Sequence, residues 1–247
     1  LADCVNSCTK AIMPVHLYGR SADMDAILGF ANKHNLKVIE DAAQAIGVTF
    51  DNQHVGFFGD AGAISLYGNK TITSGEGGII LTNNDDIAEK CRQLKGTFVH
   101  EHIGFNFSIT EMQSAIGIAQ LRKLPAIIQR KQQIYDAYTS SLANISGLRS
   151  LPLSPRYQPV HWFTSFYADD REALADDLAS WGIQTRLFFC PLHLQPCYQG
   201  WADPKVDYSA SVQAYAEGIS LPSSYTLKDE ELNFVIERIK AFYQSRQ

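Results

Sequence analysis

Residues that could do chemistry follow several short apolar runs of this sequence. His16, Asp41 and Ser65 each come at the end of such a run, and Lys70 with the glycine-rich residues 73–78 follows Ser65. A lysine amine acts as a base when desolvation or a nearby cation lowers its pKa. A carboxylate can hold a cationic partner through a charge-assisted hydrogen bond. Because α/β sheets bind ligands at the carboxyl ends of their strands, we expect these residues to line one site.

Each of these features also has a simpler explanation when it is taken alone. An aspartate at a strand end often caps a helix or occupies a turn, and a single lysine is usually a solvated surface charge. Glycines 75, 77 and 78 alone indicate only a turn with unusual dihedral angles. His16 is as compatible with packing as with function. The combination, in this order, is what indicates a site.

Two nucleotide-binding motifs are excluded by their spacing. Residues 62–71 resemble a phosphate-binding P-loop, which needs its second glycine directly before the lysine and four residues after the first. Here five residues separate Gly62 from Gly68, and Asn69 stands between Gly68 and Lys70. The glycines of residues 75–78 precede an apolar strand pattern instead of a helix, so they are not a dinucleotide fingerprint.

The first half of the chain alternates strand and helix patterns, which is typical of a βαβ sheet. Asn84 is a suitable N-cap for the second helix. We expect strands at residues 11–15, 37–40, 62–66 and 78–82, and helices at 23–34 and 85–94.

The second half predicts long helices followed by a small α+β domain. Pro125 should kink the first long helix or restart it. We expect helices at residues 110–124, 126–142, 171–181 (with Gly182 as C-cap) and 228–243, and strands at 161–168, 184–189 and 219–221. The predicted division is a large domain over residues 1–125 and a linking helix with a small domain over 126–247.

Composition is that of an ordinary globular enzyme, with 45% apolar and 19% charged residues and a net charge of −5. The absence of a lysine and arginine block argues against nucleic acid as a partner. No apolar run is long enough for a membrane span, and no leader pattern begins the chain, so we expect a cytoplasmic protein. The five scattered cysteines predict reduced thiols, with neither disulfides nor a bound metal.

Taken together, the motifs resemble the DegT/DnrJ/EryC1/StrS family of sugar aminotransferases, nearly from end to end and most closely its perosamine-synthase branch. The matching segments are residues 14–19 (PVHLYG), 40–45 (EDAAQA), 65–73 (SLYGNKTIT), 75–78 (GEGG), 104–107 (GFNF), 113–117 (QSAIG) and 186–196 (RLFFCPLHLQP). The resemblance implies a fold-type-I transferase dependent on pyridoxal phosphate, with a mostly parallel central sheet and a smaller C-terminal α+β domain.

The resemblance also implies roles for particular residues. Lys70 would bond to the cofactor as a Schiff base and move the proton, and Asp41 would keep the pyridine nitrogen protonated. Gln44 would contact the ring hydroxyl, and Ser65 would donate to the phosphate. Asn106 would reach the phosphate in the other subunit of a homodimer.

Other residues mark the substrate side and the departures from the family pattern. By resemblance, His16 and His193 are candidate substrate contacts. Ser108 stands where members often carry arginine, which leaves one cationic contact in doubt. Lys70 argues against the dehydratase branch, which has histidine at this position.

The implied reaction transfers an amino group, expected from glutamate, to a keto carbon of a nucleotide-linked deoxysugar. A 4-keto sugar is favoured, for amino sugars of bacterial surface polysaccharides such as lipopolysaccharide O-antigen. The alternative is a binding or regulatory relative that keeps the fold without turnover. Only ten residues precede the first strand, so we also expect an N-terminal part of such an enzyme to be missing. We therefore expect this chain alone to bind pyridoxal phosphate weakly and to turn over slowly or not at all.

Overall fold

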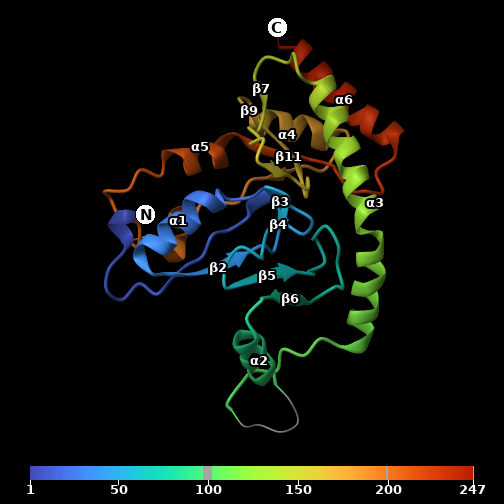
Figure 1. The fold of residues 1–247 in the computed structure, drawn as a ribbon. Coiled ribbons are helices and arrows are strands. Elements are labelled where there is room, and N and C mark those ends of the chain that lie inside the picture. Colours follow the sequence, from blue (N-terminus) through green and yellow to red (C-terminus); the bar gives the residue numbers. More distant parts are fainter. Residues whose placement is uncertain (97–101, 199, 247) are drawn as a thin grey trace. The chain divides into compact units, whose positions relative to one another are not determined.

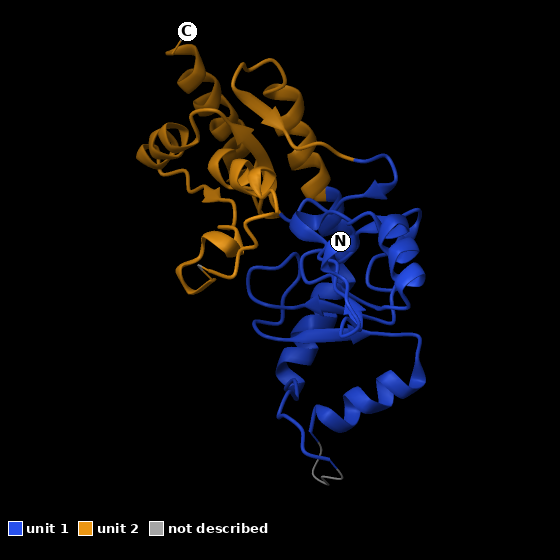
Figure 2. Ribbon diagram, turned by 90° about the vertical axis from the view of Figure 1, so that its left-hand side faces the viewer, with its two compact units in different colours: residues 1–129, 154–162 blue, residues 130–153, 163–247 orange. Residues whose placement is uncertain are grey.

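The computed structural model describes residues 1–96, 102–198 and 200–246, which form two compact units (Figure 2). Unit 1 consists of Leu1–Gln129 and Ser154–Trp162, and unit 2 of Arg130–Leu153 and Phe163–Gln247. The segment Ser154–Trp162 therefore belongs to unit 1, although the residues on both sides of it belong to unit 2.

The central sheet of unit 1 has the strand order β1-β2-β5-β6. Figure 1 labels β2, β5 and β6 of this sheet. Its strands are β1 (Ala11–Ile12), β2 (Lys37–Asp41), β5 (Ala61–Ser65) and β6 (Gly78–Leu81). Strand β2 pairs in parallel with β1 and with β5, whereas β6 is antiparallel to β5. The predicted α/β class with a mostly parallel sheet is confirmed. The first strand is much shorter than expected, since beyond Ile12 a single bridge joins Val15 to Asp41, and β6 ends one residue before its expected end.

Helices α1 (Met24–His34) and α2 (Asp85–Leu94) begin at side-chain caps. The Asp23 carboxylate accepts from the backbone of Ala26 at 3.2 Å, and the Asn84 side chain accepts from Ile87 at 3.0 Å. These bonds satisfy backbone N–H groups that a helix start leaves without partners. The predicted N-cap at Asn84 is confirmed.

A second, three-stranded sheet in unit 1 was not expected from the sequence. It joins β3 (Thr49–Phe50) to β4 (Gln53–His54) and to β8 (Tyr157–Gln158), both antiparallel. Arg156, next to β8, forms ion pairs with Asp25 and Asp51. Strands of two residues carry no detectable periodicity, and the pairing of β3 with β8 also joins residues distant in sequence.

The helical patterns around Pro125 form one helix, α3 (Glu111–Ser141), with the proline inside it. Two outcomes were predicted at Pro125, a kink or a restart of the helix. The restart does not occur. Within α3, the residues up to Gln129 belong to unit 1 and those from Arg130 onward belong to unit 2.

Unit 2 is built on an antiparallel sheet with the order β10-β11-β9-β7. Its strands are β7 (Leu148–Ser150), β9 (Thr164–Ala168), β10 (Arg186–Leu187) and β11 (Gly218–Leu221), and its further helices are α4 (Arg171–Ser180), α5 (Ser209–Glu217) and α6 (Asp229–Gln244). Strand β10 is shorter than the strand expected at residues 184–189, and neither β7 nor α5 was predicted.

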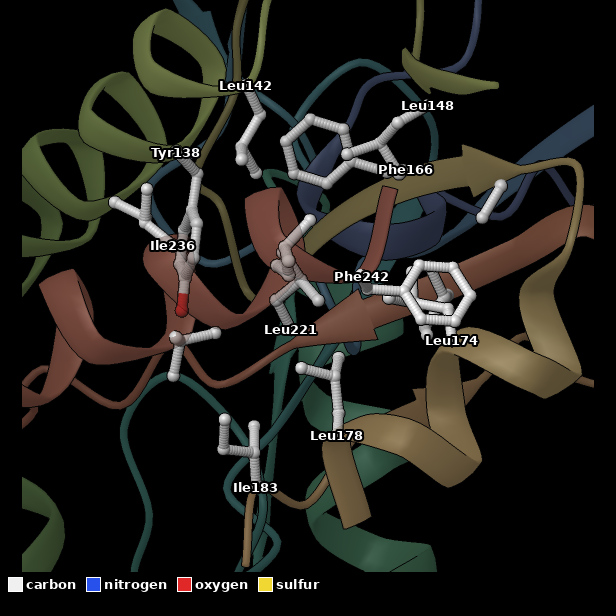
Figure 3. Packing of buried hydrophobic residues seen from close by; sticks show 14 of the residues in the cluster. Tyr138, Leu142, Leu148, Phe166, Leu174, Leu178, Ile183, Leu221, Ile236 and Phe242 are labelled. Carbon is white, nitrogen blue, oxygen red and sulfur yellow. The ribbon is translucent and has the colours of Figure 1, made fainter. Parts of the chain in front are cut away.

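The core of unit 2 is formed by buried side chains of α3, α4, α6 and the sheet (Figure 3). Tyr138, Phe166, Leu174 and Leu221 are all at most 3% exposed. A separate core in unit 1 packs α1 and the sheet strands around Met24. Among the described helices, none is both long enough and apolar enough to cross a membrane.

Candidate active site

The carboxyl ends of three parallel-running segments meet at one edge of the unit 1 sheet. The Asp41 amide donates to the Pro14 carbonyl at 2.9 Å, and the His16 amide donates to the Asp41 carbonyl at 2.9 Å. On the other side, Asp41 is paired with Ala63 of β5, two residues before Ser65. The structure therefore brings Asp41 and Ser65 to the same edge, as the sequence predicted.

Lys70 lies in the loop between β5 and β6, and backbone hydrogen bonds close that loop. Leu66 donates to the Gly77 carbonyl at 2.9 Å and accepts from Ser74 at 2.9 Å. The Thr73 hydroxyl donates to the Leu66 carbonyl at 3.0 Å and accepts from the Gly75 amide at 2.8 Å. These bonds hold the glycine-rich segment against the start of the loop and fix the backbone around the lysine.

The amine of Lys70 is partly buried and acts electrostatically on the Asp41 carboxylate. Burial lowers the pKa of Lys70 below its ordinary value, and the negative charge of Asp41 offsets part of that decrease. A lysine whose pKa is lowered is neutral more often near pH 7, and the neutral amine is the nucleophile and the base. The carboxylate of Asp41 therefore acts electrostatically on a partly buried amine, an arrangement suited to acid–base chemistry.

Three predicted site residues each use one polar atom to hold the local backbone. Asp41 Oδ1 accepts from Ala43 at 3.0 Å, Gln44 Oε1 accepts from Tyr18 at 2.8 Å, and Ser65 Oγ accepts from Tyr67 at 3.2 Å. The hydrogen bonds of the described residues leave Asp41 Oδ2, the Gln44 amide nitrogen and the Ser65 hydroxyl hydrogen available. Such a set offers one acceptor and two donors to a ligand.

Glu40 has a role that sequence reasoning missed. Its carboxylate is 0% exposed and accepts four hydrogen bonds, from His16 Nε2 at 3.0 Å and from the amides of Gly56, Phe58 and Gly59 at 2.7–2.8 Å. Burial raises the pKa of Glu40, but these hydrogen bonds outweigh it, so the pKa lies below its ordinary value. The position of Glu40 in its strand could have indicated this role. Every second side chain of a strand faces the same side, so Glu40 faces the same buried side of β2 as Val38.

His16 requires a correction. We expected a substrate contact, but its ring is fully buried, with Nε2 on Glu40 and Nδ1 accepting from the Ala22 amide at 3.2 Å. Both ring nitrogens are thus engaged within the chain. His16 holds the loop after β1 against β2, and we assign it a positioning role.

Trp162 is a second residue that the sequence did not indicate. Its ring is 3% exposed, and the Lys70 amine lies 4.5 Å from the ring centre. The indole Nε1 donates to the Asn69 carbonyl at 2.7 Å. The expected strand at residues 161–168 begins only at Thr164, so Trp162 precedes it and lies in unit 1.

The remaining predicted residues are not part of this group. Asn106 is exposed in a loop whose neighbours Phe105 and Phe107 donate to the carbonyls of Leu94 and Lys95. Ser108 is exposed in the same loop. His193 belongs to unit 2, where its ring stacks on Tyr208 with centroids 4.3 Å apart.

The described residues contain no group of three histidine, cysteine, aspartate or glutamate side chains placed to hold a metal ion. All five cysteines are free thiols. The polar groups at the sheet edge, in contrast, suit an organic anion that also carries a cationic ring nitrogen, because a lysine and a carboxylate are present together.

The comparisons with known proteins show the class to which this chain belongs, the aminotransferases dependent on pyridoxal phosphate. A solved structure, Streptomyces venezuelae DesV, superposes with a TM-score of 0.91 at 31% identity, covering 97% of this chain and 67% of DesV. Residues 1–240 match the DegT/DnrJ/EryC1/StrS aminotransferase family, and the chain belongs to that family. Pyridoxal phosphate is the cofactor of the family.

Two relatives illustrate what the chain is similar to. The GDP-perosamine synthase of Escherichia coli O157:H7 is 36% identical over 248 residues, which cover 96% of this chain and 67% of the relative. A pleiotropic regulatory protein of Geobacillus stearothermophilus is 37% identical over 248 residues, covering 96% and 66%. The chain thus spans about two thirds of the length of the relatives it matches.

Proposed function

We propose that this chain carries the lysine-bearing site of an aminotransferase that moves an amino group from glutamate to a nucleotide-linked keto-deoxysugar. The observation that carries the proposal is the partly buried Lys70 amine, with its lowered pKa, coupled to Asp41. A 4-keto sugar is the favoured acceptor, because GDP-perosamine synthases are among the similar proteins. The amino sugar product would serve surface polysaccharides such as lipopolysaccharide, and we propose a cytoplasmic enzyme.

The residues present fit the cofactor of the family. When bound, pyridoxal phosphate supplies an electron sink for the carbon that loses a proton. Lys70 Nζ would bond to it covalently and, once released, carry the proton. Asp41 Oδ2 would accept from the ring nitrogen and keep it protonated through a charge-assisted hydrogen bond. The Gln44 amide would donate to the ring hydroxyl, and the Ser65 hydroxyl would donate to the phosphate.

We further propose that the enzyme is a homodimer in which Asn106 serves the site of the neighbouring subunit. Large apolar side chains are exposed around Asn106, namely Phe105 (63%), Phe107 (72%) and Met112 (76%). Exposed apolar side chains gathered in one segment are typical of an interface. They support the proposed assembly at this loop.

The second candidate is a regulatory or binding protein that keeps the fold. The similarity to the Geobacillus pleiotropic regulatory protein favours it. The retained Lys70 and Asp41 favour the enzyme, since a binding protein has no need of a lysine with a lowered pKa.

Transfer of ¹⁵N from labelled glutamate to a GDP- or dTDP-linked 4-keto-deoxysugar would separate the two functions. With pyridoxal phosphate present, we expect slow formation of the labelled amino sugar, detected by mass spectrometry, from the parent chain and from a Lys90→Ala control, whose lysine is exposed on α2. Lys70→Ala should give none. Absence of labelled sugar from the parent chain, with the cofactor bound at Lys70, would favour the regulatory function.

A further inference from the structure

Trp162 is held in place by the segment that leaves unit 2 and enters unit 1. Strand β8 pairs with β3, and the Val160 amide donates to the Gly19 carbonyl at 3.0 Å. Gly19 has φ +72°, and a Cβ at this position would overlap the Val160 carbonyl oxygen. Backbone hydrogen bonds at β8 and at Val160 thus fix the chain shortly before the tryptophan.

The indole ring contacts two successive residues of the Lys70 loop in different ways. Nε1 donates to the backbone carbonyl of Asn69, and the ring face lies 4.5 Å from the Lys70 amine. A cation within about 6 Å of an aromatic face is stabilised by the ring's negative quadrupole, and tryptophan is the strongest such partner. The ring therefore sets both the loop backbone and the preferred place of the lysine ammonium.

We propose that Trp162 is a positioning residue for Lys70, whose ring face receives the lysine ammonium whenever the amine is not bonded to a cofactor. This inference rests on the proposed function. While released, Nζ would carry one proton between the substrate carbon and the cofactor, so it would be a cation between the two transfers. The ring would keep that cation at the site and away from solvent.

Trp162 can affect Lys70 in two opposite ways, and the test has to separate them. As an apolar cover it adds to the burial that lowers the pKa of Lys70, whereas its ring face stabilises the ammonium and raises the pKa. Among the described residues, the charged group that acts on Lys70 is the Asp41 carboxylate of β2, which also raises the pKa of Lys70. Trp162→Phe and Trp162→Leu both lose the bond to Asn69, so the difference between them reports the ring face.

The experiment titrates Lys70 in the cofactor-free chain. Lysines are reductively methylated with ¹³C, which retains their charge, and the Lys70 signal is assigned by its loss in Lys70→Ala. We expect the pKa in Trp162→Leu to be lower than in Trp162→Phe by about half a unit to one unit. If the Trp162→Leu chain does not fold, Trp162→Met takes its place. Trp201→Leu is the control, because Trp201 is 83% exposed.

The proposal would be overturned if the pKa of Lys70 were equal in Trp162→Phe and Trp162→Leu, or higher in Trp162→Leu. The ring would then act only as an apolar cover. In the cofactor-loaded chain, Trp162→Leu should lower kcat about three- to tenfold with little change in KM. Failure of the proposed function would give a different experimental result. In that case the parent chain would not bond pyridoxal phosphate at Lys70, while the cofactor-free titration would still decide the role of Trp162.

Discussion

Glu40 and Asp41 are consecutive residues of β2 whose side chains point to opposite sides of the sheet. Glu40 is 0% exposed and accepts four hydrogen bonds within the protein, whereas Asp41 is partly exposed and acts on Lys70. The alternation of a strand explains this arrangement, since neighbouring side chains face opposite ways. One carboxylate therefore holds the loop of residues 56–59 and His16 in place, while the other is presented to a ligand.

Glu40→Gln should destabilise unit 1 strongly. Each Glu40 oxygen accepts two donors, so an amide NH₂ in either place faces N–H groups and leaves them buried without acceptors. We expect the free energy of unfolding in urea to fall by about 3 kcal/mol or more. Glu76→Gln is the control, because Glu76 is exposed. Equal unfolding curves for the two variants would contradict the role of Glu40.

The same carboxylate should make stability depend on pH in the acid range. The folded-state pKa of Glu40 lies below its ordinary value of 4.5, so the unfolded chain binds the proton more readily. Its contribution is fully present above about pH 5.5 and is lost as the pH falls through the folded-state pKa. The stability difference between the parent chain and Glu40→Gln should stay constant from pH 8 to 5.5 and shrink below pH 4.5. A difference that grows with acidity would exclude this explanation.

Gly19→Ala should disturb the contact that positions residues 160–162. Gly19 has φ +72°, and an added Cβ would overlap the Val160 carbonyl. We expect a loss of at least about 2 kcal/mol in unfolding free energy, from strain and displacement together. Gly29→Ala in α1 is the matched control, since its Cβ would meet no atom within 4 Å, and it should stabilise by about 0.5–1 kcal/mol. Thermal unfolding followed by circular dichroism compares the two.

Local patterns predicted the elements that carry Asp41 and Lys70. The short strand pattern at residues 37–40 and the cap at Asn84 need only neighbouring residues, so β2 and α2 were found at nearly their observed bounds. Because parallel strands end at one edge, the proximity of Asp41 to Ser65 followed from the order of the strands.

Contacts between residues distant in sequence account for what was missed. Trp162 meets Asn69, 93 positions away, through a segment whose strand β8 has only two residues. No periodicity of the chain indicates that residues 154–162 return to unit 1. His16 was taken for a substrate contact because it follows a strand, and only the buried partner Glu40, 24 positions later, shows that it packs inside.

If Asn106 serves the neighbouring subunit, two inactive chains should restore activity when they are mixed. A Lys70→Ala chain keeps Asn106, and an Asn106→Ala chain keeps Lys70, so one site of the hybrid dimer contains both intact groups. We expect the mixture to recover up to about one quarter of parent activity, since half of the dimers are hybrids with one good site each. No recovery, with hybrid dimers verified by native mass spectrometry, would place both groups in a single chain.

The most direct test of the account is to identify the lysine that bonds to pyridoxal phosphate. Borohydride reduction of the chain with the cofactor, followed by peptide mass spectrometry, fixes the adduct to one residue. Lys131 is a demanding competitor, because burial lowers its pKa to about 8. We predict that the adduct lies on Lys70, and that Asp41→Asn weakens cofactor binding without moving it. An adduct on Lys131 or on any other lysine would contradict the assignment of this site.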